Sequence, residues 1–274
     1  MTSPIALHPH IDAIAVIDAG GNYHYVGSAS GRYAFASVTK LFSTYVVADA
    51  VLSGFISFED VIDDPYFDKG DVTLADLMSH ASGVRPVPLE CFEPRQKRIY
   101  TNEAFQYAGD FLIRRLGRQF KGVTVGQLFE EGLGSHLSTT IDIAGSCANS
   151  ATGTFDDLVK FLAEMRIPTF LDRQMHEFLV TPHCEDLPGI LPGWGHYDRN
   201  LFGIGYEIKG EKSPHWSGAC SSSSTFGHFG QSGTFVFHDP MHSVSVACVT
   251  NEAFGPWAKE AYPQMCDEIY ARFS

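Results

Sequence analysis

The sequence has little positive charge for its size. Its 19 Lys and Arg residues are outnumbered by 32 Asp and Glu residues, which gives a formal net charge of −13 over 274 residues. Nucleic acids and anionic lipid surfaces are themselves negatively charged and would repel such a chain. The composition therefore argues against nucleic acid or a membrane as a partner and leaves a small molecule as the expected one.

Long apolar runs are missing as well. The most apolar stretch, residues 45–55, is interrupted by Asp49, Ser53 and Gly54, so it falls short of the roughly 18 apolar residues that a membrane span needs. The first ten residues, MTSPIALHPH, contain no basic stretch ahead of an apolar core. No secretory signal is therefore expected there.

Paired cysteines are absent too. No two of the six cysteines form a Cys-x-x-Cys pair, which argues against a thiol-ligated zinc and a redox dithiol. The simplest interpretation is six reduced thiols in a cytoplasmic protein. His238 and His242 are four residues apart, but Pro240 between them predicts a turn rather than a helical pair of ligands. We expect no metal and no organic cofactor. The six cysteines are Cys91, Cys147, Cys184, Cys220, Cys248 and Cys266.

What the sequence does contain is an ordered series of strand and helix signals. Residues 13–18 and 23–26 flank the turn signal Gly20-Gly21-Asn22 and predict a hairpin. Apolar residues at helical spacing follow over 37–52 and stop at Gly54. Further helices are expected at 72–78, 103–116, 154–165 and 257–273, a loop-rich stretch at 181–200, and strands at 202–210, 215–220, 226–239 and 243–251.

This order differs from the regular strand–helix alternation of a parallel sheet. It predicts an α/β fold of the α+β kind, with an antiparallel sheet flanked by helices and an inserted helical lobe. Residues 1–57 and 201–274 are expected to form the sheet lobe, and residues 58–200 the mainly helical lobe. We expect the active site at the interface of the two lobes.

The helix predicted at 37–52 opens with Ser37-Val38-Thr39-Lys40. Positions i and i+3 lie on one face of a helix, so the Lys40 amine can reach the Ser37 hydroxyl. A serine hydroxyl needs an adjacent base, and a lysine can serve when burial and a helix dipole disfavour its charged form. Ser37 and Lys40 are therefore predicted to be catalytic. A serine N-cap followed by a surface lysine is the structural alternative.

The segment Tyr100-Thr101-Asn102 precedes the helix expected at 103–116. In an extended segment, Tyr100 and Asn102 point the same way, so a phenol and a carboxamide would face one site. Tyr100 is predicted to relay a proton to or from the serine or the leaving group. Asn102 is predicted to bind a substrate amide or the serine–lysine pair. An N-cap role for Asn102 is the alternative.

A third element, His228-Phe229-Gly230, lies in a glycine-spaced strand segment. Gly230 has no side chain, so the backbone of a ligand can lie close beside it. The backbone N–H of Gln231, together with that of the predicted nucleophile, is the candidate oxyanion hole. His228 is expected to position a substrate carboxylate or to polarise the Tyr100 hydroxyl. An incidental histidine at a β-bulge is the alternative.

The three patterns occur once each, in the order Ser-x-x-Lys, Tyr-x-Asn, His-x-Gly. In this order they resemble the serine β-lactamase and penicillin-binding-protein superfamily, in its class C-like branch. The segments LMSHASG at 77–83 and GTFDDL at 153–158 resemble further landmarks of that branch. The resemblance runs from near the first strand to Asn251 and implies a β-lactamase/transpeptidase-like fold.

The resemblance implies a serine hydrolase that acts through an acyl-enzyme on an ester, an amide or a β-lactam-like small molecule. True class C β-lactamases carry Lys-Thr-Gly at the third element, so the lysine that meets a substrate carboxylate is missing here. Carboxylesterases and D-amino-acid peptidases of the branch tolerate this change. The alternative is a catalytically inactive binding protein of the same fold. It is expected to have lost at least one of the predicted catalytic residues (Ser37, Lys40, Tyr100) or substrate-binding residues (Asn102, His228, Gly230, Gln231).

Overall fold

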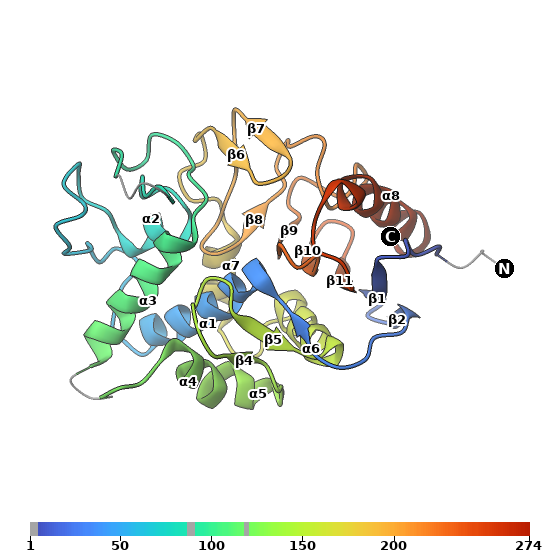
Figure 1. Cartoon of the computed structure of the whole chain (residues 1–274), viewed down its shortest axis with the longest axis horizontal. Coiled ribbons are helices and arrows are strands. Elements are labelled where there is room, and N and C mark those ends of the chain that lie inside the picture. Colours follow the sequence, from blue (N-terminus) through green and yellow to red (C-terminus); the bar gives the residue numbers. More distant parts are fainter. Residues whose placement is uncertain (1–4, 87–90, 118–120) are drawn as a thin grey trace.

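The computed structural model describes residues 5–86, 91–117 and 121–274. A six-stranded antiparallel sheet runs through its middle, in the order β2-β1-β11-β10-β9-β8. Two strands come from the start of the chain and four from its C-terminal part, so both ends build one sheet (Figure 1). The strands are β1 (Ile11–Ile17), β2 (Tyr23–Gly27), β8 (Glu207–Ile208), β9 (Phe226–Phe229), β10 (Phe235–Asp239) and β11 (Val244–Thr250).

The segment between these strands is mainly helical, and one more helix closes the chain (Figure 1). Three of the helices, α2, α4 and α6, begin with a threonine capping box, in which the first-turn N–H groups find side-chain acceptors. The helical elements are η1 (Ala36–Val38), α1 (Thr39–Leu52), α2 (Leu74–Met78), α3 (Asn102–Leu116), α4 (Val125–Phe129), the π-helical turn η2 (Glu130–Gly134), α5 (Ser135–Leu137), α6 (Phe155–Arg166), α7 (Arg173–Val180) and α8 (Pro256–Phe273).

Both faces of the large sheet are buried. Side chains along a strand alternate between its two faces, and β10 shows the consequence. Phe235 and Phe237 lie in one core with residues of α8, including Tyr262, whereas Val236 lies in a second core with residues of α1 and α6. The helix α1 is buried on nearly all sides, so a polar side chain within it is shielded from water.

The structure confirms the predicted fold class and the order of strands, helices, strands and a closing helix. The strand predicted at 215–220 is wrong, because these residues form turns. The His215 and Trp216 side chains are buried and bind the carboxylate of Glu207, so these aromatic residues are buried in a turn rather than in a strand. Two small sheets were not predicted; they consist of β3 (Tyr33–Ala34), β5 (Ala151–Gly153) and β4 (Asp142–Ile143), and of β6 (Gly189–Leu191) and β7 (Gly195–Tyr197).

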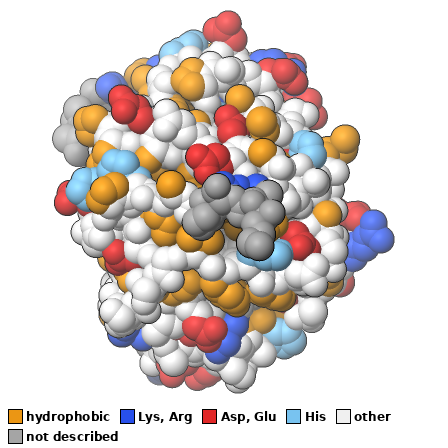
Figure 2. Space-filling view, turned by 90° about the vertical axis from the view of Figure 1, so that its right-hand side faces the viewer, with side chains coloured by type: hydrophobic (Ala, Val, Ile, Leu, Met, Phe, Trp, Pro, Cys, Tyr) orange, Lys and Arg blue, Asp and Glu red, His pale blue; other side chains and the backbone are white. Residues whose placement is uncertain are grey.

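The surface agrees with the strongly acidic composition. On the face shown in Figure 2, acidic side chains are spread over the molecule rather than gathered in one patch. Within the ranges that the structure describes, none of the helices combines the length and the apolar character needed to cross a bilayer.

Candidate active site

Ser37 lies in the 3-10 turn η1, which is one turn long and stands directly before α1. The preceding residue, Ala36, has a φ of 43°, a left-handed conformation that costs a non-glycine residue about 1–3 kcal/mol. The Ala36 carbonyl accepts a hydrogen bond from Thr39 Oγ1 at 2.6 Å, and Thr39 Oγ1 accepts one from the Ala151 N–H at 2.9 Å. These bonds hold the strained turn, and the strained turn presents Ser37 at the start of the helix.

Lys40 follows one turn later and is fully buried. Its Nζ lies 3.3 Å from Ser37 Oγ, 2.6 Å from Asn102 Oδ1 and 3.0 Å from the Ala148 carbonyl oxygen. A neutral amine has two hydrogens and one lone pair. Because Asn102 Oδ1 and the Ala148 carbonyl can only accept, they take the two hydrogens and leave the lone pair for the Ser37 hydroxyl.

Burial also sets the charge of this amine. Removing Lys40 from water disfavours its ammonium form and lowers its pKa to about 7. A large fraction of the amine is therefore neutral near neutral pH. The geometry and the protonation state agree on a group that can take a proton from Ser37.

Tyr100 comes from the segment before α3, and its side chain lines the same cavity as Ser37. The Lys40 Nζ is 4.9 Å from the centre of the Tyr100 ring, and the His80 ring packs on the same ring with centroids 4.5 Å apart. Burial raises the pKa of Tyr100 well above its usual value, although the neighbouring Ser37 hydroxyl opposes the rise. Tyr100 is therefore a protonated phenol at neutral pH and can donate its proton.

Asn102 is the first residue of α3, and the N-cap is Thr101. The Thr101 hydroxyl accepts from the Ala104 N–H at 3.0 Å, so the capping role suggested as an alternative for Asn102 belongs to its neighbour. The Asn102 carboxamide is thereby available for Lys40, which its oxygen binds at 2.6 Å.

Gly230 and Gln231 follow β9 and lie against the turn that holds Ser37. A Cβ on Gly230 would be 2.5 Å from the Phe35 carbonyl oxygen and 3.2 Å from the Ser37 nitrogen, so a side chain at this position does not fit. The Gly230 carbonyl accepts from the Gly233 N–H at 3.0 Å. Because a trans peptide directs its C=O and N–H to opposite sides, the Gln231 N–H points away from the turn that residues 230–233 form. The Gln231 side chain is itself bound to the Phe254 carbonyl, 3.0 Å away.

His228 is buried in β9, and its Nδ1 lies 2.7 Å from the Phe229 carbonyl oxygen. Burial, followed by the charge of Lys40, lowers the pKa of His228 to about 3. The ring is therefore neutral at neutral pH. Of the two roles expected for His228, recognition of a substrate carboxylate would require an N–H at Nε2, because Nδ1 is bound to the Phe229 carbonyl.

Most of these residues line one cavity of about 280 Å³. Ser37, Tyr100, Asn102, His228 and Gln231 come from three distant parts of the chain and face it together. Lys40 lies beneath Ser37 and Gly230 lies against the turn before it, as described above. Sequence reasoning missed several members of the site: the Ala148 carbonyl that binds Lys40, His80 beside Tyr100, and the cavity residues Leu191, Pro192, Phe202, Glu207 and Phe229.

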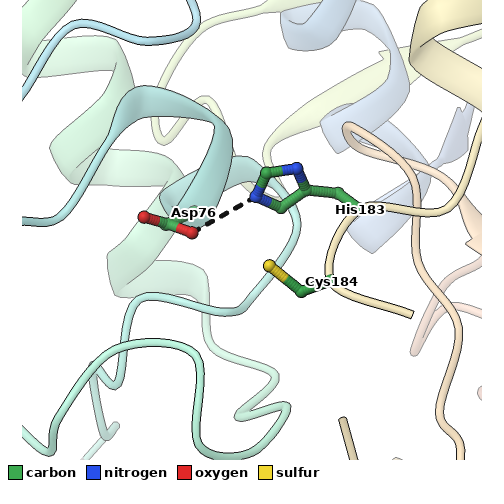
Figure 3. Close-up of side chains that lie close together, drawn as sticks. All are labelled: Asp76, His183 and Cys184. Carbon is green, nitrogen blue, oxygen red and sulfur yellow. Dashed lines mark hydrogen bonds and ion pairs between the residues drawn. The ribbon is translucent and has the colours of Figure 1, made fainter. Parts of the chain in front are cut away.

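A second polar cluster, Asp76, His183 and Cys184, has ligand atoms within 4.8 Å of one another (Figure 3). Asp76 is buried, and its carboxylate accepts hydrogen bonds from the Thr73 N–H at 3.0 Å, from Arg95 and from His183 Nε2 at 3.2 Å. Burial lowers the pKa of His183, but the hydrogen bonds and charges of Asp76 and Cys184 together outweigh this effect, and the pKa rises to about 9. As the side chains lie here, Asp76 and His183 form an ion-paired link between α2 and the segment after α7.

Together, the fold and the site define a protein of the serine β-lactamase and penicillin-binding-protein type. A family model, described as Beta-lactamase, matches residues 12–265. The chain therefore belongs to the beta-lactamase family.

Solved structures agree with this assignment. A beta-lactamase (Mb2281c) from Mycobacterium bovis is 31% identical, with a TM-score of 0.88, over 97% of this chain and 95% of that one. The hydrolase EstCE1, described as having promiscuous acyltransferase activity, is 16% identical, with a TM-score of 0.72. The match covers 95% of this chain and 94% of that one. A D-stereospecific amidohydrolase from Streptomyces sp. is 15% identical, with a TM-score of 0.69. The match covers 96% of this chain and 95% of that one. The last two show a shared fold. A search of curated proteins gave no match.

Proposed function

We propose that this protein is a serine hydrolase that acts through an acyl-enzyme at Ser37, on the ester or amide carbonyl of a small molecule. The observation that carries the proposal is the placement of the Lys40 amine. Its Nζ is 3.3 Å from Ser37 Oγ while two fixed acceptors orient it, and its pKa is lowered to about 7. A base so placed is what a serine nucleophile needs.

Acylation begins when Ser37 Oγ forms a bond to the substrate carbonyl carbon and its proton passes to Lys40 Nζ. The backbone N–H groups of Ser37 and Gln231 stabilise the oxyanion. The bond from the carbon to the leaving group then breaks. The leaving oxygen or nitrogen takes a proton from the Tyr100 phenol, and Tyr100 recovers a proton from the Lys40 ammonium.

Deacylation reverses the roles with water as the nucleophile. A water oxygen bonds to the acyl carbon and gives its proton to the Lys40–Tyr100 pair. The bond between Ser37 Oγ and the acyl carbon breaks, and the serine oxygen takes that proton back. The product is a carboxylic acid, and every step uses side chains and backbone groups of this chain.

The test is covalent labelling at Ser37. Incubation with p-nitrophenyl acetate or a penicillin-type acylating probe is expected to add one acyl group to Ser37, detected by intact-mass and peptide mass spectrometry. Ser37→Ala should abolish both the adduct and ester turnover, whereas Ser28→Ala, at an exposed serine, should leave them unchanged. A folded wild-type protein that forms no adduct and turns over no ester or amide would instead be a binding protein of this fold.

The cysteines bear on the proposed location. All six are free thiols, and three of them are buried. Free thiols persist in reducing compartments. We therefore keep the cytoplasm as the proposed location.

A further inference from the structure

The charges that line the catalytic cavity favour one class of substrate. Among the described residues around this cavity, none is Lys or Arg, and the one acidic side chain is Glu207. Lys40 lies beneath the nucleophile, where its hydrogens are directed at Asn102 and Ala148. A substrate carboxylate would therefore find no cationic side chain in the lining. The lining residues are Ser37, Tyr100, Asn102, Leu191, Pro192, Phe202, Glu207, His228, Phe229 and Gln231.

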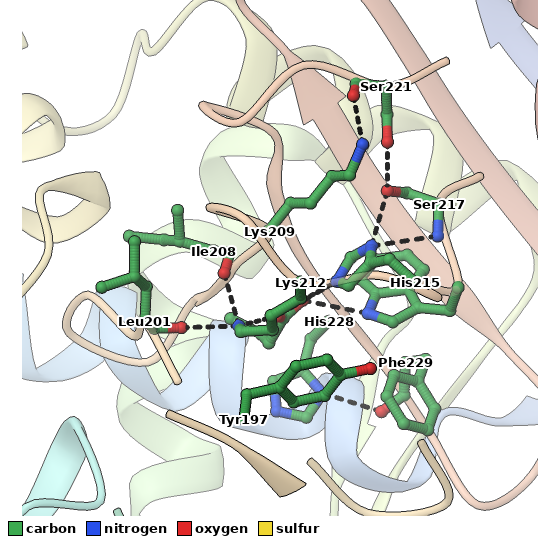
Figure 4. Close-up of polar contacts among 12 residues, drawn as sticks. Tyr197, Leu201, Ile208, Lys209, Lys212, His215, Ser217, Ser221, His228 and Phe229 are labelled. Atoms are coloured by element: carbon green, nitrogen blue, oxygen red, sulfur yellow. Dashed lines mark hydrogen bonds and ion pairs between the residues drawn. The ribbon is translucent and has the colours of Figure 1, made fainter. Parts of the chain in front are cut away.

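Lys212, which binds the lining residue Glu207, has no hydrogen left for a ligand. Lys212 is fully buried and donates to the Glu207 carboxylate, to the Leu201 carbonyl at 3.0 Å and to the Ile208 carbonyl, which accounts for all three of its hydrogens (Figure 4). His215 also binds Glu207, with Nε2 2.9 Å from Oε2. These partners balance the charge of Glu207, so neither Lys212 nor His215 offers a free positive charge to a ligand.

His228 presents a hydrogen-bond acceptor to the cavity rather than a positive charge. A carbonyl oxygen can only accept, so the Nδ1 that lies 2.7 Å from the Phe229 oxygen carries the ring proton (Figure 4). The other nitrogen, Nε2, therefore presents a lone pair. It is buried, it has no hydrogen-bond partner among the described residues, and its side chain lines the cavity. A buried acceptor without a partner costs free energy until a donor reaches it.

We propose that the cavity selects uncharged acyl donors that place an N–H or O–H group against Nε2 of His228, and that it rejects substrates with a carboxylate at that position. This inference rests on the proposed serine-hydrolase function and narrows its substrate class. A carboxylate has no donor for the His228 lone pair, and it would lose its hydration without gaining a cation. A neutral amide N–H satisfies the acceptor and carries no charge to desolvate.

Three matched p-nitrophenyl esters test the preference: those of N-acetylglycine, of N-acetyl-N-methylglycine and the half ester of succinate. Wild type should show a kcat/KM for the first about tenfold above the second and about a hundredfold above the succinate half ester. His228→Leu should reduce the preference for the N–H to about twofold or less, and His228→Lys should raise the relative rate on the succinate half ester about tenfold. The proposal would be overturned if wild type hydrolysed the succinate half ester as fast as the neutral esters. It would also be overturned if His228→Leu kept the preference for the N-acetylglycine ester over its N-methyl analogue.

A measurement without turnover separates this inference from the proposed function. In the Ser37→Ala variant, the imidazole ¹⁵N shifts of His228, assigned by comparison with Ser37→Ala/His228→Gln, should report a neutral ring protonated at Nδ1 at pH 6. Addition of N-acetylglycine amide should shift Nε2, and succinate at the same concentration should leave it in place. A doubly protonated ring, or a response to succinate alone, would refute the selection by His228 whether or not the protein hydrolyses esters. If the wild-type protein hydrolysed none of the esters, the serine-hydrolase proposal would be wrong, whereas the binding preference at His228 would still be decided by the NMR measurement.

Discussion

At the scale of single residues, the protonation of Lys40 sets the pH dependence of the proposed reaction. Burial lowers its pKa to about 7, and a protonated amine cannot take the Ser37 proton. Below that pH the reactive fraction should fall about tenfold per pH unit. We therefore expect kcat/KM for p-nitrophenyl acetate to decline on the acid side of about pH 7 with unit slope. A profile that stays level down to pH 5 would require a different base.

Asn102, which binds the Lys40 amine, offers a way to shift the pH at which kcat/KM begins to fall. This acid side of the profile is called the acid limb below. Asn102→Asp places a carboxylate where a carboxamide oxygen now lies 2.6 Å from Nζ. An adjacent negative charge favours the ammonium form, so the acid limb of kcat/KM should move up by about 1–3 pH units. Gln106→Glu adds the same charge at an exposed position of α3 and should leave the limb within a few tenths of a unit. An unshifted limb in Asn102→Asp would show that the limb does not report Lys40.

The residues of the site differ in how far the sequence could reveal them. Ser37 and Lys40 are one helical turn apart, so their proximity follows from local geometry. Tyr100 and His228 were linked to them by the order of short patterns, and the structure brings the side chains to one cavity. The Ala148 carbonyl was beyond prediction, because every residue has a carbonyl and its use depends on the fold.

At the scale of elements, the close approach of β9 to η1 is the feature that Gly230 permits. A methyl group there would meet the Phe35 carbonyl oxygen at 2.5 Å, so Gly230→Ala must push the two segments apart and move Gln231 away from Ser37. We expect kcat/KM to fall about a hundredfold or more, as for the loss of an oxyanion donor. Gly255→Ala, whose Cβ would have its nearest neighbour at 3.6 Å, should retain wild-type activity. Rates would be measured for both variants together with circular dichroism spectra as a check of folding, and a fully active Gly230→Ala would contradict the proposed oxyanion site.

The link between α2 and the segment after α7 should make stability depend on pH. The pKa of His183 is raised to about 9 in the folded protein, so its stabilisation is complete below its ordinary pKa of 6.5 and is lost as the pH rises through 9. From pH 6 to pH 9.5, wild type should lose about 1–3 kcal/mol more unfolding free energy than His183→Gln. Urea unfolding at the two pH values measures this difference. His196→Gln, at an exposed histidine, should lose as much as wild type; equal losses in wild type and His183→Gln would remove the pH-dependent role.

The elements themselves were predictable where their signal is local. The helix expected at 103–116 differs from α3 by one residue, because helical periodicity and capping are properties of the segment itself. The strands β3, β4 and β5 have two or three residues each and are too short to show a period of two. Their pairing depends on distant parts of the chain. Residues 215–220 were wrongly predicted as a strand because they include aromatic residues that are common in strands. In the structure, His215 and Trp216 are buried in a turn around the Glu207 carboxylate.

At the scale of the whole molecule, the site depends on how both ends of the chain meet. The β1 strand pairs with β11, with Ala13 opposite Val249. One hydrophobic core joins these strands to helices of the inserted segment, for example to Leu112 and Phe161. We propose that the sheet lobe and the helical lobe, which share this core, unfold as one cooperative unit.

A pair of substitutions in α8, on the opposite side of the sheet from α1, tests this cooperativity. Ile269 is fully buried, so Ile269→Ala should lower the free energy of unfolding by about 2–5 kcal/mol. Glu268, the adjacent residue, is half exposed and pairs with Arg272 at 3.4 Å, so Glu268→Ala should cost about 0.5 kcal/mol or less. If the lobes unfold together, ester turnover and helical circular dichroism will be lost at the same urea concentration in each variant, because a cavity under α8 weakens the sheet that carries His228 and Gln231. Turnover that survives after half of the helical signal is gone, or disappears well before it, would show that the lobes are separate units joined only at the catalytic cavity.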